Sequence, residues 1–264
     1  MENSNGARIM LKLIDSHCHL DQTEDIERVL RNAVEAGVEA IVCVGTNYES
    51  NLKNLELVQK FQQPKLLLAL GLHPTEIETE KIETALEFIR QNINMAVAIG
   101  EIGLDFWNKE AKKNPQKKLE QEEVFRKQLL IAKEFDLPVN IHSRGSWVRC
   151  LEMVKKAEVK KVVFHWYSGS VEVLKEILAE GFFISATPAL MYSPQHQEAI
   201  KLAPLERLFL ETDSPVFYGE GAGGFRAEPK DVFRTLQLVA RLKTLSEETV
   251  AKTTTENVRA FFKI

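Results

Sequence analysis

The sequence predicts an α/β fold, a single (β/α)8 barrel of the TIM type, from three observations. Short apolar runs recur eight times along the chain, and each is followed by a segment with helical periodicity. Most runs are continuously apolar, as in 41–44 (IVCV), which is typical of parallel strands covered by helices on both faces. The length of 264 residues is close to the ~250 usual for one such barrel, whereas a doubly wound open sheet usually has fewer strands.

The predicted strands and helices alternate strictly. The strands span residues 10–18, 40–45, 66–72, 95–101, 138–142, 161–165, 182–187 and 207–213. After a first helix that begins near residue 24, the helices span 51–61, 82–92, 119–135, 147–156, 171–180, 195–202 and 230–241. A terminal helix at 253–262 is expected to pack back through Val258, Phe261 and Phe262. No linker rich in Pro, Gly or Ser divides the chain, so we expect one domain over residues 1–264.

Local signals define the first helix and two segments without regular structure. Thr23 is the predicted N-cap of that helix, and Gly37 stands where a glycine ends one. Residues 108–118 (NKEAKKNPQKK) are predicted to form a solvated loop, with contact to a polyanion as the alternative. Residues 219–225 (GEGAGGF) are predicted to form a mobile lid, because no Lys-Ser or Lys-Thr follows them as in a phosphate-binding loop.

The bulk composition limits the function classes. With 34 Lys and Arg against 38 Asp and Glu, the net charge is −4, which gives no support to a broad nucleic-acid-binding surface. A nucleic-acid substrate is not excluded, because metal ions can supply positive charge locally. Three dispersed cysteines, a polar start at 1–8 and no long apolar run predict a cytoplasmic protein with reduced thiols and no membrane span.

Five of the six histidines fall at the carboxyl ends of predicted strands or just beyond them: His17, His19, His73, His142 and His165. Active sites of β/α barrels lie at that face. His17 and His19 are two residues apart on one strand, so both side chains point to the same side. A lone His-x-His pair or a lone core histidine is more often structural, but the shared position of the five favours a metal site.

Two carboxylates complete the predicted site. Glu101 closes the fourth predicted strand after the small apolar run 96–99, where a carboxylate without a cation would be costly. Its two oxygens can bridge two ions, as a two-metal hydrolase needs. Asp213 closes the eighth strand, which lies beside the first in a closed barrel, so we expect it near His17 and His19. Capping of a following helix or turn is the structural alternative for both carboxylates.

These side chains predict two divalent metal ions at the carboxyl ends of the strands. The predicted ligands are His17, His19, Glu101, His142, His165 and Asp213. Four imidazoles with two carboxylates suit zinc, manganese, cobalt or nickel, whereas magnesium prefers oxygen ligands. The predicted chemistry is hydrolysis by a metal-bound hydroxide, with Asp213 as the general base beside Glu101.

Six short motifs cover nearly the whole chain. They are DSHCH at 15–19, GLHP at 71–74, IGEIGLD at 99–105, IHSR at 141–144, HWYSG at 165–169 and ETDSP at 211–215. Together they resemble the TatD-related deoxyribonucleases, a branch of the amidohydrolase-like metal-dependent barrels. The resemblance implies a barrel with one or two ions, one held by His17, His19, Glu101 and Asp213, and the other by Glu101, His142 and His165. It also implies hydrolysis of phosphodiester bonds in DNA, including removal of nucleotides from a 3′ end.

Further residues near the predicted site are candidates for contact with the substrate. His73 and Arg144 are predicted to bind substrate, since a guanidinium matches phosphate oxygens; a shaping turn and an ordinary surface arginine are the alternatives. The chain departs from the family in two places, with Trp166-Tyr167 where members often have Cys-Phe, and with a longer loop at 219–225. Trp166 and Tyr167 either stack on a base or pack beneath a loop, and the second is favoured.

Two other functions are compatible with the same residues. An amidohydrolase or esterase acting on a small molecule or on aminoacyl-tRNA would use the same binuclear site to attack a carbonyl. A barrel that has lost catalysis and only binds a partner is the third possibility, and the presence of all six ligands counts against it. The favoured substrate is DNA, as single strands or 3′ ends, with a monomeric enzyme and no obligatory protein partner.

Overall fold

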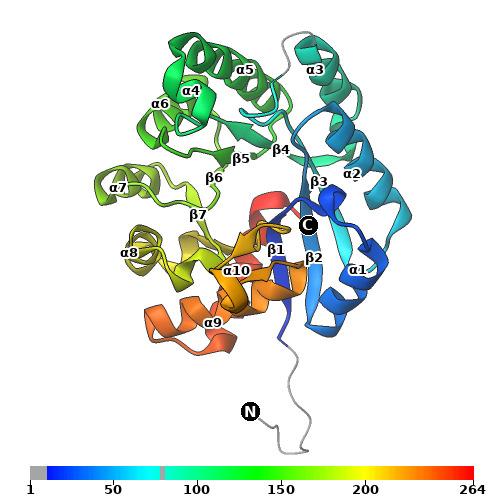
Figure 1. The fold of residues 1–264 in the computed structure, drawn as a ribbon, viewed down its shortest axis with the longest axis vertical. Helices are drawn as coiled ribbons and strands as arrows, with labels where there is room; N and C mark the ends of the chain where they lie inside the picture. Colours follow the sequence, from blue (N-terminus) through cyan, green and yellow to red (C-terminus); the bar gives the residue numbers. More distant parts are fainter. Residues whose placement is uncertain (1–10, 78–80) are drawn as a thin grey trace, which may run out of the picture.

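The computed structural model describes residues 11–77 and 81–264 and contains the predicted barrel (Figure 1). Eight parallel strands form one sheet in the order of the sequence. They are β1 (Leu13–Cys18), β2 (Val38–Val44), β3 (Lys65–Leu70), β4 (Ala96–Gly103), β5 (Val139–His142), β6 (Val162–Phe164), β7 (Phe183–Ala186) and β8 (Leu208–Leu210). The predicted fold class is therefore confirmed, although Met10, the predicted start of the first strand, and residues 1–8 lie outside the described residues.

The ring closes where the end of β8 meets β1. The Asp213 N–H donates to the His17 carbonyl at 3.0 Å, and the His19 N–H donates to the Ser214 carbonyl at 2.8 Å. The buried carboxylate of Asp15 accepts the N–H of Thr212 at 2.9 Å. These bonds fix the carboxyl ends of the first and last strands to each other.

Helices surround the strands (Figure 1). They are α1 (Ile26–Glu35), α2 (Tyr48–Lys60), α3 (Ile82–Gln91), α4 (Lys109–Lys113), α5 (Pro115–Glu134), α6 (Trp147–Ala157), α7 (Val171–Ala179), α8 (Pro194–Leu202), α9 (Val232–Lys243) and α10 (Glu247–Phe262). Short 3-10 turns are η1 (Leu20–Gln22), η3 (Ile93–Met95), η4 (Pro188–Met191), η5 (Leu205–Arg207), η6 (Gly221–Gly223) and η7 (Pro229–Asp231). None of the described helices is long and apolar enough to cross a membrane.

The interior of the barrel is filled with apolar side chains at one end. Ile14, Val42 and Phe209 belong to one buried cluster with Val258 and Phe261 of α10. The terminal helix therefore packs back as predicted, although it begins earlier, at Glu247, where Ser246 accepts the N–H of Thr249. Because this end is packed, the polar site lies at the carboxyl ends of the strands.

Two local predictions need correction. Asp25, not Thr23, caps α1, because its side chain accepts the N–H of Arg28. The predicted loop at 108–118 is wrong: Asn108 caps α4, and Asn114 caps α5 with Pro115 at its first position. The asparagine caps and the proline at the first position of α5 favour helices here more strongly than the run of charged residues favours a loop.

The segment around 219–225 is partly regular. An antiparallel hairpin of β9 (Phe217–Tyr218) and β10 (Phe225–Arg226) frames its glycine-rich tip. The expected lid motion stays a prediction.

A buried histidine on α8 makes the stability of the fold depend on pH. His196 is fully buried; its Nε2 accepts the N–H of Thr187 at 3.1 Å, and its Nδ1 donates to the Tyr167 carbonyl at 2.7 Å. Burial lowers the pKa of His196 from 6.5 to about 4. Since the folded pKa lies below the unfolded one, this histidine stabilises the fold fully above about pH 6.5 and loses that effect as the pH falls toward 4.

We expect wild type to lose about 2 kcal/mol more unfolding free energy than His196→Gln between about pH 7.5 and pH 5. The variant lacks the group that must bind a proton on unfolding, while all other titrating groups are shared. Urea unfolding at both pH values measures the difference. Equal losses in the two proteins would contradict this assignment.

Candidate metal centre

Four donor atoms converge at the mouth of the barrel from β1, β4 and the segment after β8. His17 Nε2 and His19 Nε2 lie 3.4 Å apart, and each lies 3.4 Å from Glu101 Oε2. Asp213 Oδ1 lies 3.4 Å from His17 Nε2 and 3.3 Å from His19 Nε2. Ligands at about 2.1 Å from a tetrahedral ion are about 3.4 Å from one another, so the spacing fits a single small divalent ion.

A second group of donors gathers on the other oxygen of Glu101. His142 Nδ1 and His165 Nε2 each lie 2.8 Å from Glu101 Oε1 and 3.3 Å from each other. His73 Nε2 lies 3.4 Å from the same oxygen. His73 was predicted to bind substrate, but its position also makes it a candidate ligand. The structure thus brings all six predicted ligands together, with Glu101 shared by the two groups.

The backbone of β4 and of the segment after β3 places the buried carboxylate of Glu101 between the two groups of donors. The Glu101 N–H donates to the Gly45 carbonyl at 3.0 Å, and β4 continues to Gly103, so Glu101 lies within the strand and not at its end. A Cβ atom on Gly71 would lie 2.5 Å from the carbonyl carbon of Gly100. The chain after β3 can therefore approach Glu101 only because it has a glycine there.

The protonation of the ion-free centre reflects its concentration of charge. Burial raises the pKa of Glu101, but the surrounding imidazoles of His73, His165 and His17 outweigh it and hold the pKa well below its usual range. Burial lowers the pKa of His19, yet the hydrogen bond to Asp213 and the charge of Glu101 raise it to about 9. The proton held by His19 therefore offsets carboxylate charge that a divalent cation would otherwise offset, and binding of an ion would release it.

Each of three histidines uses its second ring nitrogen for a further polar side chain of the barrel. Nδ1 of His17 lies 3.1 Å from Asn140 Oδ1, and Nε2 of His142 lies 3.2 Å from Asp105 Oδ2. Nδ1 of His165 lies 3.3 Å from Glu211 Oε1. These contacts turn the other nitrogen of each ring toward Glu101, as carboxylate and amide partners do for metal-binding histidines.

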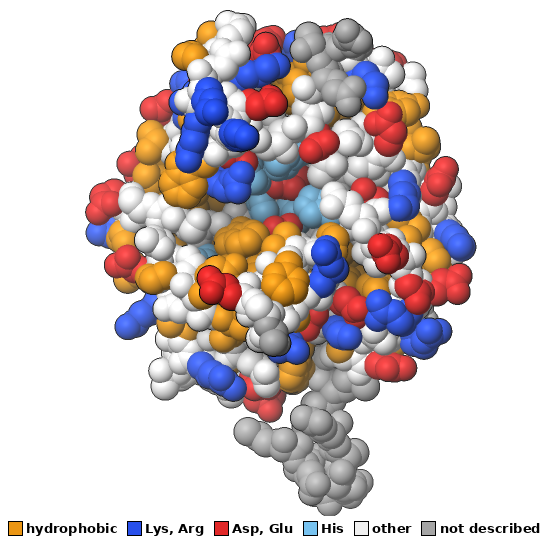
Figure 2. All heavy atoms as spheres, in the orientation of Figure 1, with side chains coloured by type: hydrophobic (Ala, Val, Ile, Leu, Met, Phe, Trp, Pro, Cys, Tyr) orange, Lys and Arg blue, Asp and Glu red, His pale blue; other side chains and the backbone are white. Residues whose placement is uncertain are grey.

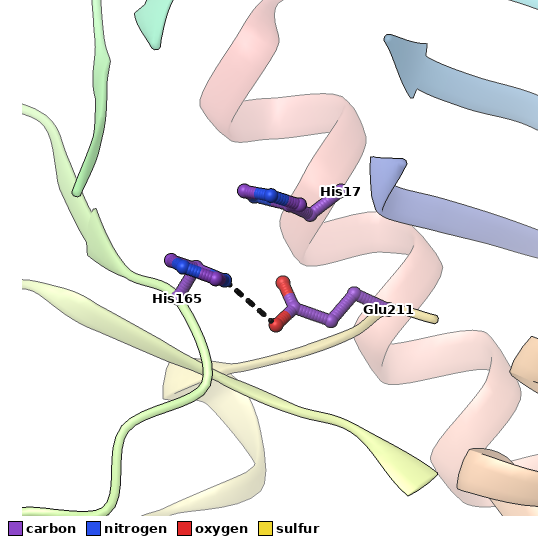
Figure 3. Close-up of side chains that lie close together, drawn as sticks. All are labelled: His17, His165 and Glu211. Atoms are coloured by element: carbon purple, nitrogen blue, oxygen red, sulfur yellow. Dashed lines mark hydrogen bonds and ion pairs between the residues drawn. The ribbon is translucent and has the colours of Figure 1, made fainter. Parts of the chain in front are cut away.

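Figure 3 shows Glu211 beside His165, whose ring stacks on that of His17 with centroids 4.0 Å apart. Glu211 is fully buried, and its Oε1 also accepts the N–H of Trp166 at 3.0 Å. This contact holds Trp166 at a φ of 41°, a conformation that bulky side chains rarely adopt. Glu211 therefore fixes both the His165 ring and the turn that follows it.

Sequence reasoning missed Glu211, Asp105 and Asn140. All three lie in or next to the six motifs, but a side chain that orients a ligand has no spacing rule of its own. Glu211 was assigned to the eighth strand, which in fact ends at Leu210.

The site lies at the bottom of a pocket of about 930 Å³. Figure 2 shows the histidine side chains and red carboxylates at the base of this hollow. Arg144 lines the pocket, but its Nε and Nη2 bind the Asp105 carboxylate at 3.0 and 2.8 Å, so a phosphate could meet only its outer edge.

Tyr167 is fully buried and its hydroxyl donates to the Ser170 carbonyl, which confirms that this residue packs beneath a loop. Trp166, in contrast, also lines the pocket.

The family model described as TatD related DNase matches residues 14–263. The chain belongs to this family. It is 32% identical to "Deoxyribonuclease TATDN3" of Homo sapiens over 262 residues, covering 95% of this chain and 94% of the relative. It is 33% identical to "Uncharacterized metal-dependent hydrolase MJ1582" of Methanocaldococcus jannaschii, covering 96% and 98% of the two chains. The crystal structure of YJJV, a TatD homolog from Escherichia coli K12, superposes with a TM-score of 0.86 at 27% identity, covering 97% of this chain and 100% of that one.

These relationships confirm the resemblance and the barrel fold. Together with the donor groups around Glu101, they make the chain a TatD-family metal-dependent hydrolase, and therefore an enzyme. The hypothesis of a barrel without catalysis is not favoured.

We expect Glu211→Gln to weaken binding of divalent ions about 10- to 100-fold, because the amide removes the charge that orients His165. Isothermal titration of the ion-free protein with zinc or manganese measures the change. Glu198→Gln, an exposed position on α8, is the matched control and should bind like wild type. Unchanged affinity in Glu211→Gln would show that His165 keeps its orientation without this carboxylate.

Proposed function

We propose that the chain is a deoxyribonuclease that hydrolyses phosphodiester bonds and removes nucleotides from the 3′ end of single-stranded DNA. The observation that carries the proposal is the position of Glu101, whose two oxygens belong to two different groups of donor atoms. A carboxylate that serves two groups at once is what a pair of ions a few Å apart requires. A relative similar over nearly the whole chain is named as a deoxyribonuclease, which supports DNA as the substrate.

The residues of the chain divide into two proposed ion sites. His17, His19 and Asp213 would hold one ion with Oε2 of Glu101, and His142 and His165, with His73 beside them, would hold the other with Oε1. The ions would offset the charge on phosphate oxygens and lower the pKa of water. The high share of imidazole favours zinc, manganese, cobalt or nickel over magnesium.

Asp213 is the proposed general base. Its carboxylate lines the pocket, so it can accept the proton of an attacking water molecule while Oδ1 faces His17 and His19. The oxygens of Glu101 face two different groups of donor atoms, which suits a fixed role between the two proposed ions.

We further propose a monomer in the cytoplasm. Every proposed ligand comes from one chain, so catalysis needs no second copy. The three cysteines are buried and free, as a reducing compartment would keep them.

The first test is cleavage of a 5′-labelled single-stranded oligonucleotide by the metal-loaded protein. We expect stepwise shortening from the 3′ end, abolished by EDTA and reduced about 10²- to 10⁴-fold in kcat by Asp213→Asn, which cannot accept the proton. Denaturing gel electrophoresis resolves the products. An intact oligonucleotide with every divalent ion tried, together with hydrolysis of a carboxylic ester, would replace this proposal with carbonyl chemistry at the same centre.

A further inference from the structure

The pocket carries an exposed tryptophan on one side of its mouth. Trp107 lies in the segment between β4 and α4, lines the pocket and is 53% exposed. Tryptophan is among the side chains most often buried on average, and an exposed one at a binding site offers a large flat surface for a ligand. The proposed ion sites are complete without any contact from Trp107.

The surrounding residues hold the Trp107 ring in place. A Cβ atom on Gly145 would lie 2.3 to 2.6 Å from three atoms of the five-membered ring, so the indole rests on the Gly145 backbone. The ring of Trp147 stands perpendicular to it, with centroids 5.3 Å apart. The backbone N–H of Trp107 donates to Asp105 Oδ1 at 3.1 Å. The ring is therefore preorganised while more than half of the side chain stays open to a ligand.

Asp105 connects this tryptophan to the metal centre. The same carboxylate that accepts the backbone N–H of Trp107 also accepts that of Asn108 at 2.9 Å, binds Arg144 and lies 3.2 Å from His142 Nε2. A ligand that contacts Trp107 is consequently held at a defined position relative to Glu101.

Positive charge continues from Trp107 along α4. Lys109, Lys112 and Lys113 are exposed, with Glu110 as the acidic residue among them, and Nζ of Lys112 lies 6.0 Å from the Trp107 ring centroid. In Figure 2, a run of blue side chains over α4 leads toward the histidine-lined hollow.

Acidic side chains outnumber lysines in the pocket lining contributed by the segments after β1, β2 and β3. Asp21, Glu49 and Glu76 lie there, with Lys53, whose ammonium donates to the Asp21 carbonyl. A polyanion that enters the pocket is therefore attracted over α4 and repelled on the other side.

We propose that Trp107, Lys109, Lys112 and Lys113, here called the α4 strip, bind the unpaired nucleotides of a DNA strand that leads into the metal centre. One base stacks on the open indole face, and backbone phosphates lie against the lysines. A duplex offers no free base face to Trp107, so the strip selects single strands. The inference rests on the proposed deoxyribonuclease function and assigns its substrate-binding subsite.

The stacking contact is tested by binding a fluorescent single-stranded oligonucleotide with cleavage-resistant phosphorothioate linkages to the metal-loaded enzyme. We expect Trp107→Ala to raise Kd roughly 5- to 100-fold, the range for removal of one stacked base, and Trp107→Phe to restore part of the affinity. Phe135→Ala, which removes a partly exposed aromatic at the end of α5, should leave Kd unchanged. One abasic nucleotide moved along the strand should weaken wild type at a single position and have no effect there in Trp107→Ala.

The phosphate contacts are tested by the salt dependence of the same Kd. Replacing Lys109, Lys112 and Lys113 by Gln should reduce the slope of log Kd against log salt by about 0.7 for each phosphate that no longer meets a lysine. The matched control replaces Lys65, Lys160 and Lys252, three exposed lysines that do not line the pocket, and should keep the wild-type slope.

The binding and cleavage readouts separate the two proposals. If Trp107→Ala kept the wild-type Kd and the triple lysine variant kept the wild-type salt slope, the α4 strip would be rejected as a DNA-binding subsite, whatever the enzyme cleaves. The expected weakening of binding in those variants, with no cleavage of unmodified DNA by wild type, would uphold the strip as a nucleic-acid subsite and reject the deoxyribonuclease function. A rise in KM with unchanged kcat on unmodified DNA would support both.

Discussion

The carboxylate of Glu101 is 2% exposed and lies among the imidazoles of five histidines. A buried carboxylate destabilises a fold unless cations or protons compensate its charge. The histidines that compensate it arrive from the carboxyl ends of several strands, so the charge can be accommodated only when β1, β3, β4, β5 and β6 all end around one point. The polar centre thus depends on correct closure of the whole sheet.

Further contacts hold the ligands in this arrangement. The bonds between Asp213 and His17 and between Thr212 and Asp15 close the barrel beside the centre, while α10 fills its opposite end. Asn140, Asp105 and Glu211 then orient three of the rings. Two of the non-glycine residues with positive φ, Trp166 and Asp213, lie beside the centre. Backbone strain of this kind persists where surrounding contacts determine the conformation, and it is common at functional sites.

The sequence was informative where a residue's role follows from its place on a strand. His17, His19, His142 and His165 could be placed because parallel strands bring their carboxyl ends to one face. Glu211 and Asp105 could not, because their roles depend on which ring nitrogen they meet, and that depends on side-chain rotation in the folded protein. Helix α4 and the first turn of α5 were missed because Asn108 and Asn114 act as caps through local hydrogen bonds, which charge patterns do not reveal.

The net charge of −4 concerns the whole molecule, whereas a substrate meets local charge. A net charge this small gives no broad attraction for a polyanion, and attraction by local charges is screened within about 10 Å at ordinary ionic strength. DNA binding at the α4 strip would therefore be confined to a short segment that reaches the pocket, where lysines and ions lie close together. A strand end needs only such a short contact to reach the metal centre, which gives a physical reason for the proposed action at strand ends and not along a continuous helix.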